Sequence, residues 1–316
     1  MQLPTLDDVE MAARRIDGAV LRTPLSFARI GKVEVGLKWE NHQTGGAFKL
    51  RGASNRLLAM TEEERTKGVV AFSSGNHARG VAIAARRLGI HAIIVMPSDA
   101  PAVKIEHTRA EGAEIILYDR YRENREEIAA RIAADSGAIV VPSFDDPYIV
   151  AGQGTVGLEL AAQYRAARGK EPKRILVNCG GGGLSSGIAL ACPDADVVTV
   201  EPEGWDDMER SFAAGEVVPV ASDAPKTLCD ALQTPKVSPI TFGILQARGA
   251  TGVHVSEEAV RIAVRHAWHE WGEVVEPGGA VSLAALLSGV VEPRDGDVAI
   301  ISGGNVEPAL HAELVA

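Results

Sequence analysis

Short apolar runs alternate with amphipathic stretches over much of this chain. Four apolar runs of strand length lie at residues 69–72, 92–95, 114–117 and 138–141. The stretches between them place apolar side chains at helical spacing and keep one polar face, at 78–88, 102–111 and 122–134. Strands that alternate with helices in this way predict a parallel sheet covered by helices on both faces.

A second alternating series follows residue 147. It comprises helix 155–168, strand 174–178, helix 184–191 and strand 197–200, then, after an irregular stretch, helices 257–271 and 280–288 and strand 298–301. We therefore predict an α/β fold with two domains, each an open, mainly parallel twisted sheet flanked by helices. The smaller domain is expected at residues 50–142, inserted between 1–49 and 143–316, which form the larger one.

Polar and glycine-rich clusters follow three of the predicted strands. They are Ser73-Ser74-Gly75-Asn76-His77, Gly180-Gly181-Gly182-Gly183-Leu184, and Ser302-Gly303-Gly304-Asn305. Ligands of open parallel sheets bind beyond the carboxyl ends of the strands, so these clusters predict one binding site. Helix capping also favours Ser and Asn, but it accounts for one such residue rather than a whole cluster.

The four consecutive glycines indicate a phosphate site. They follow a strand and open a helix, where bare backbone amides and the helix dipole favour an anion. A dinucleotide site is the rival interpretation, because Glu201 follows the next strand at a suitable distance for a ribose hydroxyl. No G-x-G-x-x-G triplet fits, however, since Ser185 or Ser186 stands on the last position, and the Gly-Lys-Ser ending of a P-loop is missing.

Lys49 stands in the segment Thr44-Gly45-Gly46-Ala47-Phe48-Lys49-Leu50-Arg51-Gly52-Ala53, which we expect to hold it between two glycine-containing turns. Burial would lower its pKa, and a neutral amine can form a Schiff base with a carbonyl. A solvated lysine in a surface turn explains this segment better when it is taken alone.

Bulk properties narrow the class of protein. The 316 residues carry a net charge of −10, which argues against a nucleic-acid surface. Three cysteines without close pairs, Cys179, Cys192 and Cys229, argue against a disulfide framework and suit a reducing compartment. The N-terminal segment lacks the apolar core of a signal peptide, and no apolar run is long enough for a membrane span. We therefore expect a soluble, cytoplasmic protein.

Together the motifs resemble the pyridoxal-phosphate enzymes of the tryptophan-synthase-β fold (fold type II), in the serine/threonine dehydratase and serine racemase branch. The match is carried by the three clusters and the Lys49 segment, and by Ala151-Gly152-Gln153-Gly154-Thr155 and Glu276-Pro277-Gly278-Gly279-Ala280. The resemblance covers nearly the whole chain. It implies pyridoxal 5'-phosphate in the cleft between two domains, a homodimer, and the short, catabolic type without a feedback module.

The resemblance also implies a role for each site residue. Lys49 would bind the cofactor as a Schiff base and then act as a general base, with Phe48 packed on the ring. Asn76 would bond the phenolic oxygen, Ser302 the pyridine nitrogen, and Gly180, Gly181, Gly182, Gly183 and Leu184 the phosphate. Ser73, Ser74, Gly75, Asn76 and His77 would bind the substrate carboxylate, and Ser74 matches the hydroxyl that racemases use on the face opposite the lysine.

Two further expectations concern less usual positions. Arg79 stands where glutamine is common, so it could bind a second substrate carboxylate and favour 3-hydroxyaspartate, although a surface ion pair is the alternative. Glu201, Trp205 and Asp207 match a site for Mg²⁺ or Ca²⁺ in part of this branch, and solvated acidic residues are the alternative there. Asn178-Cys179 stands where Pro-Val is usual before the glycines.

The resemblance implies an ammonia-lyase that converts a β-hydroxy amino acid of the serine, threonine or 3-hydroxyaspartate class to a 2-oxo acid and ammonia. An amino-acid racemase of the serine racemase type is the alternative. A dehydrogenase and a cofactor-binding protein without catalysis are two further hypotheses. The partner would be a small amino acid, with neither nucleic acid nor membrane.

Overall fold

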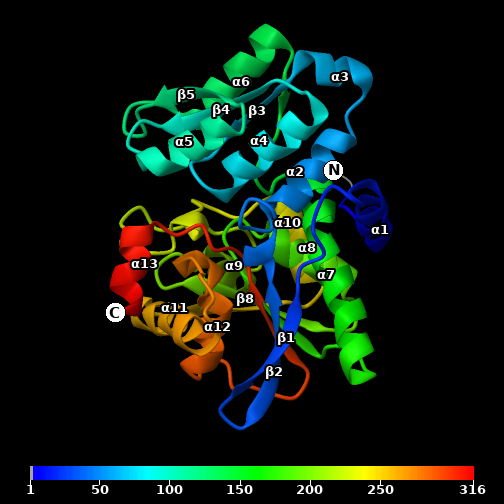
Figure 1. Cartoon of the computed structure of the whole chain (residues 1–316), viewed down its shortest axis with the longest axis vertical. Coiled ribbons are helices and arrows are strands. Elements are labelled where there is room, and N and C mark those ends of the chain that lie inside the picture. The colour runs from blue at the N-terminus through cyan, green and yellow to red at the C-terminus, as the bar shows by residue number, and fades with distance from the viewer. Residues whose placement is uncertain (1–2) are drawn as a thin grey trace.

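The computed structural model describes residues 3–316 and contains two separate β-sheets (Figure 1). The smaller sheet has the strand order β5-β4-β3-β6, and all its pairs are parallel. Its strands are β3 (Val69–Phe72), β4 (Ala92–Pro97), β5 (Glu114–Tyr118) and β6 (Ile139–Val140).

The larger sheet has the order β1-β2-β10-β7-β8-β9. It is parallel except for the antiparallel hairpin that β1 and β2 form at one edge. Its strands are β1 (Leu25–Ile30), β2 (Val33–Trp39), β7 (Arg174–Asn178), β8 (Asp196–Pro202), β9 (Thr251–Val255) and β10 (Asp297–Ile301).

Helices flank both sheets, and α2 lies between the two parts of the molecule (Figure 1). Those before β7 are α1 (Leu6–Arg15), α2 (Lys49–Leu58), α3 (Glu62–Lys67), α4 (Asn76–Leu88), α5 (Ala102–Ala110), α6 (Arg125–Ser136) and α7 (Pro147–Arg168). Those after it are α8 (Gly183–Ala191), α9 (Asp207–Ala214), α10 (Pro239–Ala247), α11 (Glu257–Trp271), α12 (Val281–Leu287) and α13 (Pro308–Val315). Three short 3-10 turns are η1 (Glu40–His42), η2 (Asp230–Leu232) and η3 (Pro277–Gly279).

Successive side chains of the central strand β10 enter opposite cores. Val298 and Ile300 pack in the core that α1, α7, α8 and α10 cover, whereas Ala299 and Ile301 pack in the core under α11, α12 and α13. The smaller sheet is covered by α2 and α4 on one face and by α6 on the other. Burial on both faces explains why the strands read as continuous apolar runs, and it confirms the predicted α/β class.

One predicted helix was placed too late in the chain. Helix α7 begins at Pro147 rather than at residue 155, because the side chain of Asp146 accepts a hydrogen bond from the Ile149 amide and Pro147 suits the first helical position. The glycines inside it do not break it, since they allow close packing. A Cβ on Gly152 would lie 2.6 Å from the Cα of Gly52 on α2.

Other elements were missed or misplaced. The stretch expected to be irregular contains α9, α10 and β9, and the β1–β2 hairpin was not predicted. Helix α6 begins at Arg125 rather than at residue 122, because the side chain of Asn124 caps it. The run 138–141 forms only the two-residue strand β6.

No helix found between residues 3 and 316 is both long and apolar enough to cross a membrane. All four strands of the smaller sheet fall within residues 50–142, although the domain bounds themselves stay a prediction.

Candidate active site

A cavity of about 360 Å³ opens at the carboxyl ends of strands from both sheets, and we call it the cleft. The loop after β3, the loop after β7 and the end of β10 all line it, as the position of the three clusters predicted. Among the predicted site residues, those that line it are Phe48, Lys49, Ser73, Ser74, Gly75, Asn76, His77, Gly180, Gly181, Gly182, Gly183, Leu184 and Ser302.

Lys49 is the first residue of α2 and projects into this cleft. The expectation of a lysine between two turns was half wrong, because only the preceding glycines, Gly45 and Gly46, lie in a turn with positive φ. The Phe48 amide donates to the Ser302 carbonyl, so the segment is attached to the end of β10. The Lys49 amine donates to the Ser143 carbonyl at 3.0 Å.

The environment of Lys49 favours a neutral amine. Desolvation lowers its pKa to about 8, and the nearby Glu276 carboxyl opposes this shift. An ammonium carries three N–H donors, and the Lys49 amine has a single protein acceptor among residues 3–316. The amine is therefore available to a carbonyl compound that enters the cleft.

The glycine loop has the features of an anion site. No oxygen acceptor from the described chain bonds the backbone amides from Gly180 to Leu184, which precede or begin α8. Side chains would block this surface, since a Cβ on Gly181 would lie 2.2 Å from the Phe144 ring. Gly182 also has a φ of 83°. The free amides at a helix N-terminus fit a phosphate group.

Ser302 is held by Asn178, a residue to which the sequence assigned no role. The Asn178 amide group donates to Ser302 Oγ at 2.8 Å and to the Gly279 carbonyl at 2.8 Å. Its carbonyl oxygen accepts from the Ser282 backbone and hydroxyl. Because Ser302 Oγ accepts from Asn178, its own proton remains free to donate to a neutral ring nitrogen.

Asn76, the first residue of α4, contacts a second residue without an assigned role. Its amide nitrogen donates to Glu276 Oε1 at 2.6 Å. Burial raises the pKa of Glu276 to about 7, with Asp230 adding to the shift. Glu276 lines the cleft and lies in a motif that had been recognised only as a match.

His77 belongs to the wall but carries no charge for a substrate. Its Nε2 lies 2.9 Å from the Val141 carbonyl, which only accepts, so this nitrogen holds the proton. Burial lowers the pKa of His77 to about 3, and the neighbouring Lys49 contributes. The neutral ring fixes the loop after β3 to the chain beyond β6.

Three cationic side chains line the smaller-sheet side of the cleft, and the sequence pointed to none of them. Lys104 pairs with Asp230 on the opposite side of the cleft, and Arg120 pairs with Asp99. Arg125 takes part in no ion pair within the described chain, and its guanidinium carbon lies 5.6 Å from the centre of the Phe72 ring.

Arg79 lies beside the cleft, in a cavity that shares Ser74, Gly75 and Asn76 with it. It lines a neighbouring cavity of about 300 Å³ and is absent from the lining of the cleft. Its Nη1 donates to Asn305 Oδ1 at 3.2 Å. This bond places the guanidinium at the loop after β10, and its contact with a substrate carboxylate stays a prediction.

The residues expected to bind a metal ion lie beyond β8. Glu201 and Asp207 are buried, and their oxygens accept from the amides of Met208, Glu209 and Val237. Burial, and for Glu201 the Asp207 charge, raise the pKa values of both carboxyls, that of Asp207 to about 7. No cationic side chain in residues 3–316 pairs with either. Buried carboxylates without a counter-charge fit a hard divalent cation, so this site stays a prediction.

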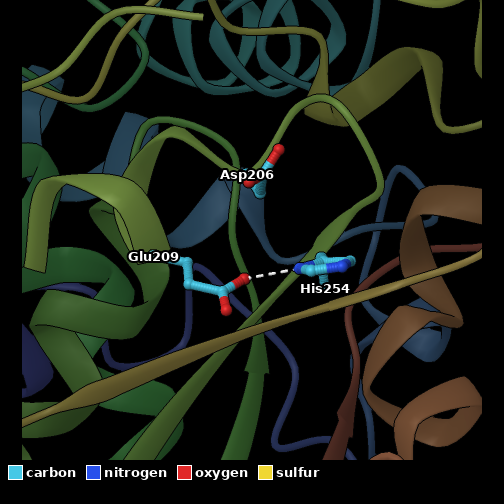
Figure 2. A group of neighbouring side chains, drawn as sticks. All are labelled: Asp206, Glu209 and His254. Carbon is cyan, nitrogen blue, oxygen red and sulfur yellow. Dashed lines mark hydrogen bonds and ion pairs between the residues drawn. The ribbon is translucent and has the colours of Figure 1, made fainter. Parts of the chain in front are cut away.

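A second group lies beside this loop and outside the cleft. Figure 2 shows the side chains of Glu209 and His254 facing each other, with Asp206 nearby. His254 Nδ1 lies 2.7 Å from Glu209 Oε2, and that hydrogen bond raises the pKa of His254. Ion pairs of His254 with Glu209 and of Arg210 with Asp206 account for these side chains without a metal ion.

Comparison with known proteins agrees with this geometry. The family model described as "Pyridoxal-phosphate dependent enzyme" matches residues 16–303. An L-threo-3-hydroxyaspartate ammonia-lyase of Pseudomonas sp is 41% identical, over 100% of this chain and 99% of that protein. A serine racemase of Schizosaccharomyces pombe is 39% identical, over 99% and 98%. The solved structure of maize serine racemase superposes with a TM-score of 0.92 at 34% identity, covering 99% of this chain and 97% of the other.

Proposed function

The chain belongs to the family of pyridoxal-phosphate dependent enzymes, and from that premise we propose that it is an ammonia-lyase for a β-hydroxy amino acid with a second carboxylate. The preferred substrate is 3-hydroxyaspartate, which loses ammonia to give a 2-oxo acid. One observation carries this choice of substrate. Arg125 lines the cleft without a carboxylate partner in the described chain.

The cofactor would be held by groups that the protein leaves free. The amides from Gly180 to Leu184 suit its phosphate, the Ser302 hydroxyl suits its ring nitrogen, and Phe48 lines the same cleft. When bound, pyridoxal phosphate supplies an electron-withdrawing ring that stabilises negative charge at the substrate Cα. Ser302 donates as a neutral hydroxyl, which leaves the ring nitrogen without a proton and favours elimination over transamination.

The residues of the chain would perform the proton transfers and the binding. Lys49, with its lowered pKa, takes the Cα proton as a general base. The loop from Ser73 to His77 presents amides and hydroxyls to the first carboxylate, beside the N-terminus of α4. Arg125 binds the second carboxylate through its planar guanidinium, which suits two parallel hydrogen bonds. Arg79, in the adjoining cavity, is the alternative ligand for that carboxylate.

A panel of substrates tests the proposal. The cofactor-loaded protein would be assayed for 2-oxo acid and ammonia with the stereoisomers of 3-hydroxyaspartate, and with serine and threonine. We expect the highest kcat/KM for a 3-hydroxyaspartate isomer. Arg125→Ala should lower that value about 10- to 100-fold and change the value for serine only a few-fold. The reason is that a hydrogen bond to a charged group contributes about 1.5–3 kcal/mol.

A matched control lies on the same helix. Arg131 is exposed on α6 and does not line the cleft, so Arg131→Ala should leave both substrates unaffected. Equal losses on serine and 3-hydroxyaspartate in Arg125→Ala would disprove the dicarboxylate assignment. Absence of 2-oxo acid from every substrate would disprove the lyase itself.

Racemisation is the second candidate. Ser74 lines the cleft, and one close relative is named a serine racemase. Ser74→Ala should abolish interconversion of D- and L-serine while elimination from the L-isomer continues. The metal ion at Glu201, Trp205 and Asp207, the homodimer and the cytoplasmic location also remain proposals.

A further inference from the structure

Four side chains form a continuous chain of hydrogen bonds from the neighbouring cavity to the cleft. Arg79 Nη1 donates to Asn305 Oδ1 at 3.2 Å, and Asn305 Nδ2 donates to Asn76 Oδ1 at 2.7 Å. Asn76 Nδ2 then donates to Glu276 Oε1 at 2.6 Å. The two end groups are a guanidinium and a carboxyl, and every donor points in the same direction.

The orientation of the Asn305 amide follows from two partners with a single role each. A guanidinium can only donate, so the oxygen of Asn305 faces Arg79. The Gly45 carbonyl can only accept, so the nitrogen faces Gly45, at 2.7 Å. The second hydrogen on that nitrogen points to Asn76.

The orientation of Asn76 follows in turn. Its oxygen must face the nitrogen of Asn305, which leaves its nitrogen facing Glu276. That nitrogen carries two hydrogens, and Glu276 takes one. The other is free, and Asn76 lines the cleft. Arg79 and the Gly45 carbonyl therefore determine, through Asn305, which end of the Asn76 amide meets a ligand.

The space around the chain is kept open by two glycines. A Cβ on Gly46 would lie 2.4 Å from Asn305 Oδ1, and a Cβ on Gly303 would lie 2.1 Å from Glu276 Oε1. Gly46 also has a φ of 76°. Both glycines thus make room for polar atoms of this chain, which marks the arrangement as specific rather than incidental.

We propose that Arg79 is a positioning residue that acts through Asn305 to present an N–H of Asn76 to the ring oxygen of the bound cofactor. In a partly buried chain with aligned donors, each hydrogen bond polarises the next, so the guanidinium also strengthens the last donor. Loss of Arg79 removes one of the two partners that orient the Asn305 amide and leaves the Gly45 carbonyl alone, so the orientations of Asn305 and Asn76 are held less strongly. The inference rests on the cofactor assignment and is independent of the substrate.

The test uses the cofactor-loaded protein without substrate. The position of the absorption band of the bound cofactor and its dissociation constant would be measured for wild type, Arg79→Ala, Arg79→Gln and Asn305→Ala. We expect Arg79→Ala and Asn305→Ala to shift the band and to weaken cofactor binding about tenfold, which is the size of one lost charge-assisted hydrogen bond. Arg79→Gln keeps an N–H donor and should stay closer to wild type.

Two comparisons separate positioning from general damage. The double variant of Arg79→Ala with Asn305→Ala should be no worse than either single one, because both interrupt the same chain. Arg86 lies on α4, as Arg79 does, and pairs with Glu111 at the end of α5. Arg86→Ala should change neither the band position nor the dissociation constant. An unshifted band with wild-type affinity in Arg79→Ala, or additive losses in the double variant, would overturn the inference. Because no substrate is present, a wrong lyase assignment would leave these results unaffected.

Discussion

Two lysines of this chain lie out of bulk water, and their surroundings differ. Lys38 on β2 is fully buried, and its amine donates to the Thr23 carbonyl, Glu159 and Gln163 at 2.8, 2.9 and 3.0 Å. Lys49 lines the cleft and donates to one backbone carbonyl. Burial lowers the pKa of both, but two carboxylates oppose the shift at Lys38. The Lys38 amine has an acceptor for each of its three N–H donors, so it serves as a structural cation. The Lys49 amine has one protein acceptor, so it stays available for reaction.

Arg51 extends this contrast to whole regions. It is fully buried and bonds both oxygens of Glu40 and both oxygens of Glu159, so with Lys38 the group holds two cations and two carboxylates. These four residues, the ionic network, join β2, α2 and α7. The cleft instead contains Lys49 and Glu276 without a direct ion pair. Balanced charge stabilises the fold, and charge left without partners is available for chemistry.

The largest expected effect is on catalysis. Lys49→Ala should lower kcat at least about 10³-fold, because a general base contributes about 10²–10⁴-fold and the Schiff base is lost as well. The absorption band of the bound cofactor should disappear, and thermal unfolding should show no loss of stability. Lys49→Arg is the matched control. It keeps the charge but cannot release a proton, so activity should stay lost; more than a tenth of wild-type activity in either variant would contradict the assignment.

Substitutions in the ionic network should lower the free energy of unfolding rather than kcat. Arg51→Met leaves Glu40 and Glu159 facing Lys38 alone and should lower the free energy of unfolding by about 3–5 kcal/mol. Urea unfolding of the protein without cofactor measures it. Arg165→Met breaks an exposed pair with Glu171 and should cost less than about 1 kcal/mol. A loss below that value for Arg51→Met would show that the network does not hold the fold.

The sequence predicted the parts of this picture that depend on local pattern. Strands such as 174–178, helix 257–271 and the glycine loop between a strand and a helix are as expected, because periodicity and bare backbone are local properties. The turn expected after Lys49 is instead the start of α2. The contacts of Asn178 with Ser302 and of Asn76 with Glu276 join residues far apart in sequence, so no local sequence pattern predicts them.

Arg79 and Arg125 show the same limit at single positions. Both are arginines near the start of a helix that follows the smaller sheet's strands, and only the packing of the helices decides which one reaches the cleft. Helix α7 shows the same limit, because it was expected only from residue 155. Contacts with the partner helices α2 and α8 identify its glycines as packing positions.

The pH dependence of the free energy of unfolding should also distinguish the cleft from the ionic network. The pKa of Lys49 is about 8 in the folded protein and 10.5 is the ordinary value, so between these pH values the unfolded chain binds a proton that the folded one has released. Stability should therefore rise with pH across this window, by about 2–3 kcal/mol. Glu276, with a pKa raised from 4.5 to about 7, acts oppositely, and stability should fall as pH rises from 4.5 to 7.

Urea unfolding at several pH values, in wild type and Lys49→Met, isolates the lysine contribution. The free energy of unfolding of wild type, relative to that of Lys49→Met, should rise between pH 8 and 10.5 and stay constant below pH 7, apart from a small change because Glu276 loses a neighbouring charge. A constant difference over the whole range would mean that the Lys49 amine keeps an ordinary pKa. Unpaired charge would then not explain how Lys49 differs from Lys38.

The smallest expected effects test whether Lys38 and Lys49 contribute differently to the free energy of unfolding. Lys38→Met should lower the free energy of unfolding by about 1–2 kcal/mol, less than Arg51→Met, because Arg51 still bonds both carboxylates and Gln163 still donates to the Thr23 carbonyl. Lys49→Met, measured at pH 7, should leave stability equal or raise it, since an incompletely bonded ammonium is replaced by an apolar chain of similar length. The same substitution should thus have opposite signs at the two sites. Losses of equal size would show that Lys49 also serves the fold.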